Sequence, residues 1–571
     1  MRERRNDPPD SAADVASAYL PEPGSDTSAG LWGISNVPWL FGPRLRILFV
    51  MDGRVTVTWG DQDFGLGYVL KELRANFAWW VRLEVTTAHR GDVARTELSL
   101  GVVTISIGPE LVGFRFTQDG FDINDYDQVW FFADEPGLDG NYPNQPDSLF
   151  EKAQYRPVDD AELRIIAEWM DRGGGVFAVG DHSVLGASMC HRIPRVRSMR
   201  RWRFSQQVPP IYGDDRNETL VHLAGGDLDW EGDRWGQRIF PVMQADDRWF
   251  GALGTSPHPV MCGRAGIIDH FPDHMHEGAV FDDDEVRLDD PLGISGYERP
   301  EFPAPRPVVA EGAIAGPLVG PEEFGHRPRP HVIAYGLTSH GDTPRRFPMV
   351  GVYDGDPVGI GRIVVDSTWH HWFSLNLVGL RNEAPAHYVG MVDYYRNIAL
   401  WLATPEQRRT MLVAATWGAL IGSHPGAFDD AFGIRGLGER VLDVIGRAAP
   451  QCILDQLVAT AAMLPRRAPQ TGADERGWLW APSDRALNVA ILGGIASGLL
   501  PLAHQYIRDR ANGRELDVDI DAVTRGATEG LRSGRREIAR AASEASAIYA
   551  EVGRYVDASP GDAASRGGHD E

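Results

Sequence analysis

Residues 159–182, DDAELRIIAEWMDRGGGVFAVGDH, decide the fold class of this chain. Asp159 and Glu162 stand three residues apart before an apolar run, which is the pattern of a capping box at a helix N-terminus. Apolar side chains then recur at helical spacing, and three consecutive glycines favour the backbone that ends a helix. The apolar run 176–179 predicts a buried strand that stops at Gly180. The segment therefore predicts a helix that leads directly into a strand.

The same alternation of strand and helix extends in both directions from this segment. Short apolar runs predict strands, and amphipathic runs predict helices. The strands are expected at 45–51, 81–87, 128–133, 331–335 and 361–366, and the helices at 67–76 and 388–402. Such alternation is typical of an α/β fold in which helices cover both faces of a parallel sheet.

Composition divides the rest of the chain into further regions. Residues 1–40 are polar and proline-containing and predict a flexible N-terminal arm. The α/β domain is expected over 41–403, with insertions at about 203–257 and 281–330. Residues 404–556 are rich in Ala and Leu and predict a mostly α-helical domain, followed by a disordered tail at 557–571.

Charge and hydropathy exclude several classes of partner. The 571 residues include 56 Lys and Arg against 80 Asp and Glu, so the net charge is −24. An acidic chain repels phosphate backbones, so we expect no nucleic acid partner. The N-terminus lacks the apolar core of a signal peptide, which predicts a cytoplasmic location. The most apolar stretch, 486–503, is interrupted by Asn488, glycines and Pro501, which favours a buried helix pair over a membrane span.

Three cysteines stand far apart in the sequence, at Cys190, Cys262 and Cys452. They form no C-x-x-C pair, so the sequence predicts neither a disulfide scaffold nor a structural zinc ribbon. Cys190 has the surroundings of a buried core thiol.

Polar side chains follow the ends of the predicted strands. In open α/β sheets, ligands bind beyond the carboxyl ends of the strands, so we expect these groups to meet at one edge. A single Asp after a strand more often starts a turn or caps a helix, but the set as a whole predicts a site. The expected catalytic residues are Asp181, His182, His370 and His371, and the expected substrate-binding residues are Asp52, Asp134, Glu135 and Asp366.

A second cluster of ligand-type side chains lies at 270–277, HFPDHMHE. Imidazoles and carboxylates at this density suit a divalent metal such as zinc. The expected ligands are His270, His274, His276 and Glu277. The spacing does not match H-E-x-x-H or H-x-H-x-D-H, and ordinary hydrogen bonding is the alternative role of these histidines.

Residues 180–186, GDHSVLG, invite comparison with a nucleophile elbow. His182 would occupy the apex, with Ser183 beside it. Neither G-x-S-x-G nor G-x-C-x-G is present, which disfavours Ser183 and Cys190 as nucleophiles. The following run, 192–203, holds six arginines and predicts a structural strap or an anion grip.

Three strings together resemble the class I glutamine amidotransferase-like superfamily, closest to its ThuA-like branch. They are DYDQVWFFA at 125–133, GGGVFAVGDHSVLG at 173–186 and GRIVVDSTWHHW at 361–372. The resemblance covers about 44–200 and 331–402 and implies a flavodoxin-like parallel sheet.

The resemblance carries no glutaminase activity with it. The family's elbow Cys corresponds to His182, and the residues two places after His370 and His371 are Trp372 and Phe373 rather than Glu. The Cys–His–Glu triad is therefore absent from the matching positions. ThuA-like members often carry a His near the elbow, which His182 fits.

Two hypotheses follow from the sequence. The first is a hydrolase-like enzyme with a His- and Asp-lined cleft, metal-assisted if the 270–277 cluster binds zinc, that acts on a small molecule. The second is a non-catalytic amidotransferase-like module that senses a ligand or binds a partner. In that case the helical region at 404–556 would bind a protein or self-associate as a homo-oligomer.

Overall fold

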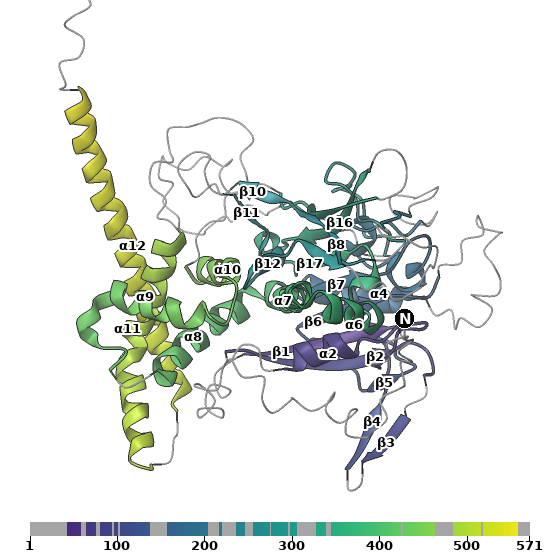
Figure 1. Ribbon diagram of the computed structural model, residues 1–571, viewed down its shortest axis with the longest axis horizontal. Helices are drawn as coiled ribbons and strands as arrows, with labels where there is room; N and C mark the ends of the chain where they lie inside the picture. The colour runs from purple at the N-terminus through teal and green to yellow at the C-terminus, as the bar shows by residue number, and fades with distance from the viewer. Residues whose placement is uncertain are drawn as a thin grey trace, which may run out of the picture. The chain divides into compact units, whose positions relative to one another are not determined.

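The computed structural model in Figure 1 describes most of the chain from residue 43 to residue 557. The predicted N-terminal arm, nearly all of the predicted tail, His274 and much of both predicted insertions lie outside the described residues. The gaps are 59–63, 76–79, 94–95, 101–102, 137–156, 204–215, 220–235, 246–254, 274–275, 295–296, 298, 305–326, 339–343, 424–425, 463–483 and 515–517.

A nine-stranded mixed sheet forms the centre of the fold (Figure 1). Its order is β5 (Leu111–Val112), β2 (Arg82–His89), β1 (Arg44–Met51), β6 (Gln128–Phe132), β7 (Gly175–Val179), β17 (Ile363–Asp366), β16 (Arg346–Tyr353), β15 (His331–Leu337) and β9 (Phe240–Pro241). The strands from β5 to β17 are parallel to one another. In chain order the five strands β2-β1-β6-β7-β17 give 2-1-3-4-5, which is the flavodoxin-like order. The predicted α/β class is confirmed.

Helices cover both faces of this sheet because its side chains alternate between two apolar layers. On one face, Leu48, Val129 and Phe131 pack into a core with residues of α4 (Asp160–Met170). On the other face, Phe49 stacks on Trp130, and the Trp130 ring meets the Trp372 ring edge to face. That second layer lies under α7 (Pro385–Leu402). The helices α2 (Gly67–Arg74) and α6 (Ser374–Glu383) both contact α7.

The capping box predicted for α4 is present. The Asp159 carboxylate accepts hydrogen bonds from the backbone N–H groups of Ala161 and Glu162, both at 2.9 Å. Glu162 in turn accepts from the Asp159 N–H at 3.2 Å. The Glu162 carboxylate also binds the Arg90 guanidinium at 2.8 Å, so the cap is tied to the end of β2.

Several strands were not predicted from the sequence. β16 was not expected, and it links the predicted strand β15 to β17 through antiparallel pairings. β9 pairs with β15 from within the expected insertion at 203–257. The remaining short elements are β3 (Thr96–Leu100), β4 (Val103–Ile107), β8 (Gly236–Arg238), β10 (Met243–Ala245), β11 (Thr255–Pro257), β12 (Cys262–Gly263), β13 (Gly266–Ile267), β14 (His270–Pro272) and the helix α5 (Ala187–Cys190).

The contacts within the chain divide it into two compact units, one with the sheet and one that is helical. The sheet unit runs to Ala414 and includes Ala448–Ile453, whereas the helical unit contains Ala415–Arg447 and Leu454–Glu571 together with Ala245–Thr255. The sequence places the boundary at Thr404, where α8 (Pro405–Gly422) begins, and the division falls inside that helix. The other helices are α9 (Gly433–Ile445), α10 (Gln451–Ala462), α11 (Asp484–Ala511) and α12 (Ile520–Asp557).

Glycines let the helices of the second unit approach closely. A Cβ atom on Gly498 of α11 would lie 2.0 Å from the backbone oxygen of Gly526 on α12. A Cβ atom on Gly493 would lie 1.8 Å from the Ile434 oxygen of α9. Within α11, Arg485–Ala511 contains a window long and apolar enough to cross a membrane, and 72% of that window is buried inside the protein.

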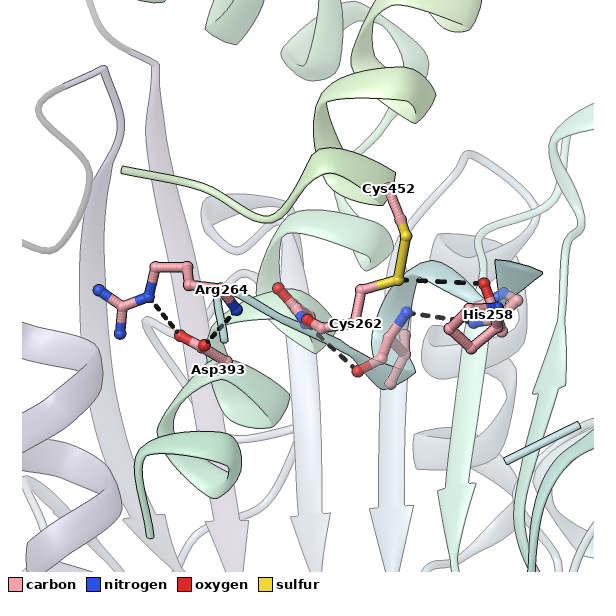
Figure 2. The surroundings of a disulfide bond; sticks show 8 residues. His258, Cys262, Arg264, Asp393 and Cys452 are labelled. Atoms are coloured by element: carbon pink, nitrogen blue, oxygen red, sulfur yellow. Dashed lines mark hydrogen bonds and ion pairs between the residues drawn. A yellow bond between two sulfur atoms is a disulfide. The ribbon is translucent and has the colours of Figure 1, made fainter. Parts of the chain in front are cut away.

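The expectation about cysteine is wrong in one respect, because Cys262 and Cys452 form a disulfide (Figure 2). The two residues are 190 positions apart, and sequence separation says nothing about distance in the fold. Asn397 of α7 donates to the Cys262 carbonyl at 2.6 Å, which holds β12 on that helix. Cys190 is the free cysteine and is buried, as predicted.

Candidate functional site

The ends of four neighbouring parallel strands bring the predicted polar residues to one edge of the sheet. Met51, Phe132, Val179 and Asp366 are aligned across β1, β6, β7 and β17. The residues that follow them are therefore at the same level of the sheet. This edge holds Asp52, Asp134, Glu135, Asp181, His182, Asp366, His370 and His371.

Asp181 lies between two imidazoles at the end of β7. Its Oδ2 atom is 3.7 Å from His370 Nε2 and 3.9 Å from His182 Nε2. Thr368 donates to the other carboxyl oxygen at 2.9 Å. Burial raises the pKa of Asp181 to about 8, although the hydrogen bonds oppose this shift. Asp181 therefore takes up and releases a proton near neutral pH.

His370 has a defined orientation beside Asp181. Its Nδ1 atom is 2.9 Å from the side-chain oxygen of Asn376, which accepts only, so Nδ1 carries the proton. The other ring nitrogen, Nε2, is then the one that faces Asp181.

His371 belongs to a separate and fully buried network. Its Nδ1 is 2.8 Å from Asp366 and its Nε2 is 3.7 Å from Glu277. Burial by itself lowers the pKa of His371, but the two carboxylates outweigh it and raise the pKa to about 10. Tyr394 and Trp372 also donate to Asp366, at 2.9 and 3.0 Å. The side chain of His371 has no exposed surface, so it holds the site together rather than contacting a ligand.

Arg200 ties the ends of β7 and β17 to each other. Its guanidinium donates to the backbone oxygens of Asp366 at 2.7 Å, Ser367 at 2.5 Å and Asp181 at 3.0 Å. The group is buried and also lies 4.2 Å from the Trp202 ring. Part of the arginine run at 192–203 is therefore a structural strap at the site.

The turn after β7 has a strained backbone at Ser183 rather than at His182. Ser183 has a φ of +58° and Arg203 a φ of +45°, values that L-residues rarely adopt. The Ser183 Oγ atom is 3.2 Å from His182 Nδ1, and Arg203 Nη1 donates to it at 3.3 Å. Strain of this kind clusters at functional sites. Ser183 is thus a stronger candidate than the sequence pattern indicates.

Accessibility separates His182 and Ser183 from their neighbours. The His182 side chain is 19% exposed, and Ser183 is half-buried. Asp181 and His370 are 2% and 3% exposed. The two exposed groups are therefore the ones that a bound molecule would contact first.

The carboxylates at the ends of β1 and β6 form a second part of the edge. Asp52 accepts hydrogen bonds from the backbone N–H groups of Asp134 at 2.6 Å and Glu135 at 3.0 Å. Arg54 neutralises Asp134 through contacts at 2.9 and 3.2 Å. Burial raises the pKa of Asp52 to about 8 and that of Glu135 to about 7.

This carboxylate group lies at the position where a flavodoxin-like sheet binds ligands. The strand order reverses between the first and third strands, here β1 and β6, and ligands bind outside that point. Asp52 Oδ2 and Glu135 Oε2 are both buried, and neither oxygen has a hydrogen-bond partner among the described residues. Each oxygen is therefore a buried acceptor that no hydrogen bond from the described residues satisfies, in keeping with the raised pKa values of both carboxyl groups.

The carboxylate group and the β7 turn are in direct contact. The Glu135 carbonyl accepts from the N–H groups of Gly186 at 3.1 Å and Ser188 at 3.2 Å. Pro136 forms a bridge with Leu185. The two parts therefore lie along one continuous edge.

The predicted metal set does not converge. Among the described residues, no group of three or more His, Cys, Asp and Glu side chains is arranged to hold a metal ion. His270 stacks on His387 with ring centroids 3.8 Å apart, whereas Glu277 is buried beside His371. The alternation of β14 separates them, since Phe271 faces His371 and His270 faces away.

His276, like Glu277, lies near the strand ends, since its ring is 5.3 Å from the ring of His182. His274 is outside the described residues.

Sequence reasoning missed Thr368, Arg200, Arg203 and Gln237. Gln237 donates to the Glu277 carboxylate, and Ser367 donates to its other oxygen at 3.2 Å. The polar string after β17, DSTWHH, was a signal for Thr368, and the arginine run was a signal for Arg200 and Arg203. No local pattern marks Gln237, which reaches Glu277 through the pairing of β8 with β14.

Comparison with known proteins adds no relative. No protein-family model matches the chain, and no curated protein or solved structure matches it either. What the site does therefore has to follow from its own side chains and their geometry.

Proposed function

We propose that the protein is a hydrolase in which Ser183 is the nucleophile, His182 the base and Asp181 the proton reservoir. The observation that carries this proposal is the pair of left-handed residues, Ser183 and Arg203, in contact through Oγ and Nη1 beside His182. A strained turn that presents a hydroxyl next to an imidazole is the arrangement of an activated serine.

Ser183, His182 and one water molecule account for every proton and for the leaving group in the proposed reaction. Ser183 Oγ attacks the acyl carbon of a small ester or amide while His182 Nδ1 takes its proton. The leaving group departs with that proton, and an acyl–Ser183 ester remains. Water then attacks the ester, His182 accepts a proton from the water, and Ser183 regains its hydrogen as the acid leaves.

Neighbouring groups support each step electrostatically. The Arg203 guanidinium 3.3 Å from Ser183 Oγ favours loss of the hydroxyl proton to His182, because a cation stabilises negative charge on Oγ. Asp181, with a pKa of about 8, stabilises the His182 imidazolium when its carboxyl group is ionised. His371 and Asp366 are positioning residues that fix the end of β17.

Substrate binding is proposed for the carboxylate group at β1 and β6. Glu135 and Asp52 each present a buried oxygen without a hydrogen-bond partner among the described residues. These oxygens suit the hydroxyl or amino groups of a small polar substrate. The contact between Glu135 and the β7 turn would bring such a substrate next to Ser183.

We also propose that the chain shares an ancestor with the class I glutamine amidotransferase-like superfamily. The flavodoxin-like strand order and the functional turn after β7 support it. Ser183, one position after the matching elbow position, would replace the family's Cys as the reactive group.

The test is covalent labelling with a fluorophosphonate, which needs no knowledge of the substrate. Ser183 Oγ would form a bond to phosphorus, fluoride would leave, and His182 would take the proton. We expect labelling of the full chain, none in Ser183→Ala, and at least about tenfold slower labelling in Arg203→Gln, since loss of one charge-assisted hydrogen bond is of that order. Ser533→Ala changes a half-buried serine of α12 and serves as the matched control.

A non-catalytic ligand-sensing module is the second candidate function. The burial of Asp181, His370 and His371 favours it, because structural ion networks are also buried and also shift pKa values. In that case the wild type would not react with the fluorophosphonate. A thermal shift with small polyols or amines, lost in Asp52→Asn, would then support the sensing function.

A further inference from the structure

We propose that the helical unit binds a small amphipathic carboxylate, such as a medium-chain fatty acid, in a cavity between α8, α11 and the segment around Phe428. The cavity is lined by four apolar side chains, Leu420, Phe428, Leu500 and Ile507. Two polar side chains, His504 and Arg508, also line it. This site is independent of the hydrolase proposed for the sheet unit.

The cavity has the size of a short aliphatic chain. Its volume is about 200 Å³. A group the size of a water molecule occupies roughly 30 Å³, so the space holds a chain of roughly six to eight carbons. The walls are mostly apolar, and burying a methylene group against them is favourable by about 0.8 kcal/mol.

One face of α11 supplies both the apolar wall and the polar end. Leu500, His504, Ile507 and Arg508 are spaced by four, three and one residues, which places them along one stripe of the helix. The stripe carries apolar contacts at Leu500 and Ile507 and has its cation, Arg508, at the C-terminal end. A ligand with a hydrocarbon tail and a charged head group matches this combination.

Arg508 supplies the charge complementarity for a carboxylate. It is exposed, and it forms no ion pair with any acidic residue that the structure describes. The adjacent Asp509 is paired with Arg514 at 2.8 Å. His504 Nε2 lies 3.3 Å from the Phe428 carbonyl, which holds the imidazole at the same end of the cavity. Carboxylates prefer such arginine partners.

The experiment is calorimetric titration of the full chain with octanoate, with octan-1-ol as the uncharged counterpart. We expect octanoate to bind, and to bind more tightly than octanol. Arg508→Gln, on the surface, should weaken octanoate binding about tenfold and leave octanol binding unchanged. Arg510→Gln removes a cation of the same helix that does not line the cavity, and it should have no effect.

A second variant tests the cavity itself. Leu500→Trp fills the space and should abolish binding of both compounds, while far-UV circular dichroism checks that the helices remain folded. The proposal is overturned if the wild type does not bind millimolar octanoate. It is also overturned if octanol binds as tightly as octanoate, or if Arg508→Gln binds octanoate as the wild type does.

Discussion

The candidate site concentrates buried ionisable side chains, and each one is compensated differently. His371 is held between two carboxylates, Arg200 is satisfied by backbone oxygens, and Asp52 accepts two backbone hydrogen bonds. An ionised group without such partners is costly to bury. These differences give each residue its own expected response to pH and substitution.

Asp52→Asn should stabilise the protein increasingly as the pH rises. Burial raises the pKa of Asp52 from 3.8 to about 8. Between those values the folded state holds one more proton than the unfolded state, so wild-type stability falls with rising pH. Asparagine keeps the acceptor oxygen and removes this loss. Urea unfolding between about pH 5 and pH 8 measures the difference, and a difference that stays constant over this range would contradict the assignment.

His371→Gln should lower the free energy of unfolding by about 3–5 kcal/mol, since it leaves Asp366 and Glu277 buried without their cation. The pKa of His371 is raised from 6.5 to about 10, so its stabilising effect is full below pH 6.5 and disappears as the pH passes 10. The loss in the variant should shrink accordingly at high pH. His182→Gln, at an accessible position, serves as the control, and equal losses in both variants would count against the buried network.

Ser183→Gly should stabilise the fold by about 1 kcal/mol while removing the proposed nucleophile, because glycine adopts a positive φ without steric penalty. Ser183→Ala removes the hydroxyl but keeps the penalty. Thermal unfolding of the two variants therefore separates backbone strain from chemistry. If the glycine variant is no more stable than the alanine variant, Ser183 is not strained.

At the scale of elements, the sequence predicted those parts whose signals are local. The capping box at Asp159 and Glu162 and the apolar runs of β1, β6, β7 and β17 needed no tertiary information. β16, RFPMVGVY, was missed because it carries Pro348 and Gly351, which disfavour strands unless neighbours select them. β9 has two residues and exists through its pairing with β15.

In the candidate site, too, some residues could be predicted from local sequence signals, and others depend on tertiary packing. Asp181, His182 and His370 could be expected together because parallel strands end at one edge. His270 and Glu277 lie apart although they are close in sequence, because the alternation of β14 places Phe271 toward His371 and His270 on the opposite side. The strain at Ser183 has no sequence signal, since backbone dihedral angles depend on the packed turn.

Gly498→Ala should destabilise the helical unit by about 1–3 kcal/mol, the usual effect of overpacking. The added Cβ would lie 2.0 Å from the Gly526 oxygen, so α11 and α12 must move apart. Gly390→Ala in α7 is the control, because its Cβ would meet only Ile268 at 3.7 Å. That control should gain about 0.5–1 kcal/mol from helix propensity. Equal effects of the two substitutions in urea unfolding would exclude the close helix contact.

At the scale of the whole molecule, the disulfide bears on where the protein works. Cys262 and Cys452 both belong to the sheet unit and join segments 190 residues apart. Disulfides persist in oxidising compartments and are rare in the cytoplasm. The sequence, by contrast, favours a cytoplasmic location. Whether Cys262 and Cys452 are oxidised or reduced in the native protein therefore distinguishes an oxidising compartment from the cytoplasm.

Reduction of the disulfide should lower the free energy of unfolding by about 2–4 kcal/mol, mainly because the unfolded chain regains freedom in a long loop. Thermal unfolding with and without dithiothreitol measures the shift. Cys452→Ser should reproduce the reduced protein and should not respond to dithiothreitol. A wild type that is insensitive to reductant would show that the bond contributes nothing to stability.

In the proposed hydrolase, the strand ends assemble around a reactive Ser183. The most direct measurement is mass spectrometric mapping of the fluorophosphonate adduct in the full-length protein. The proposed hydrolase predicts one modified residue, Ser183, with loss of the adduct when His182 is replaced by Gln. An adduct on a different residue, or an unmodified Ser183 after full exposure to the reagent, would contradict it.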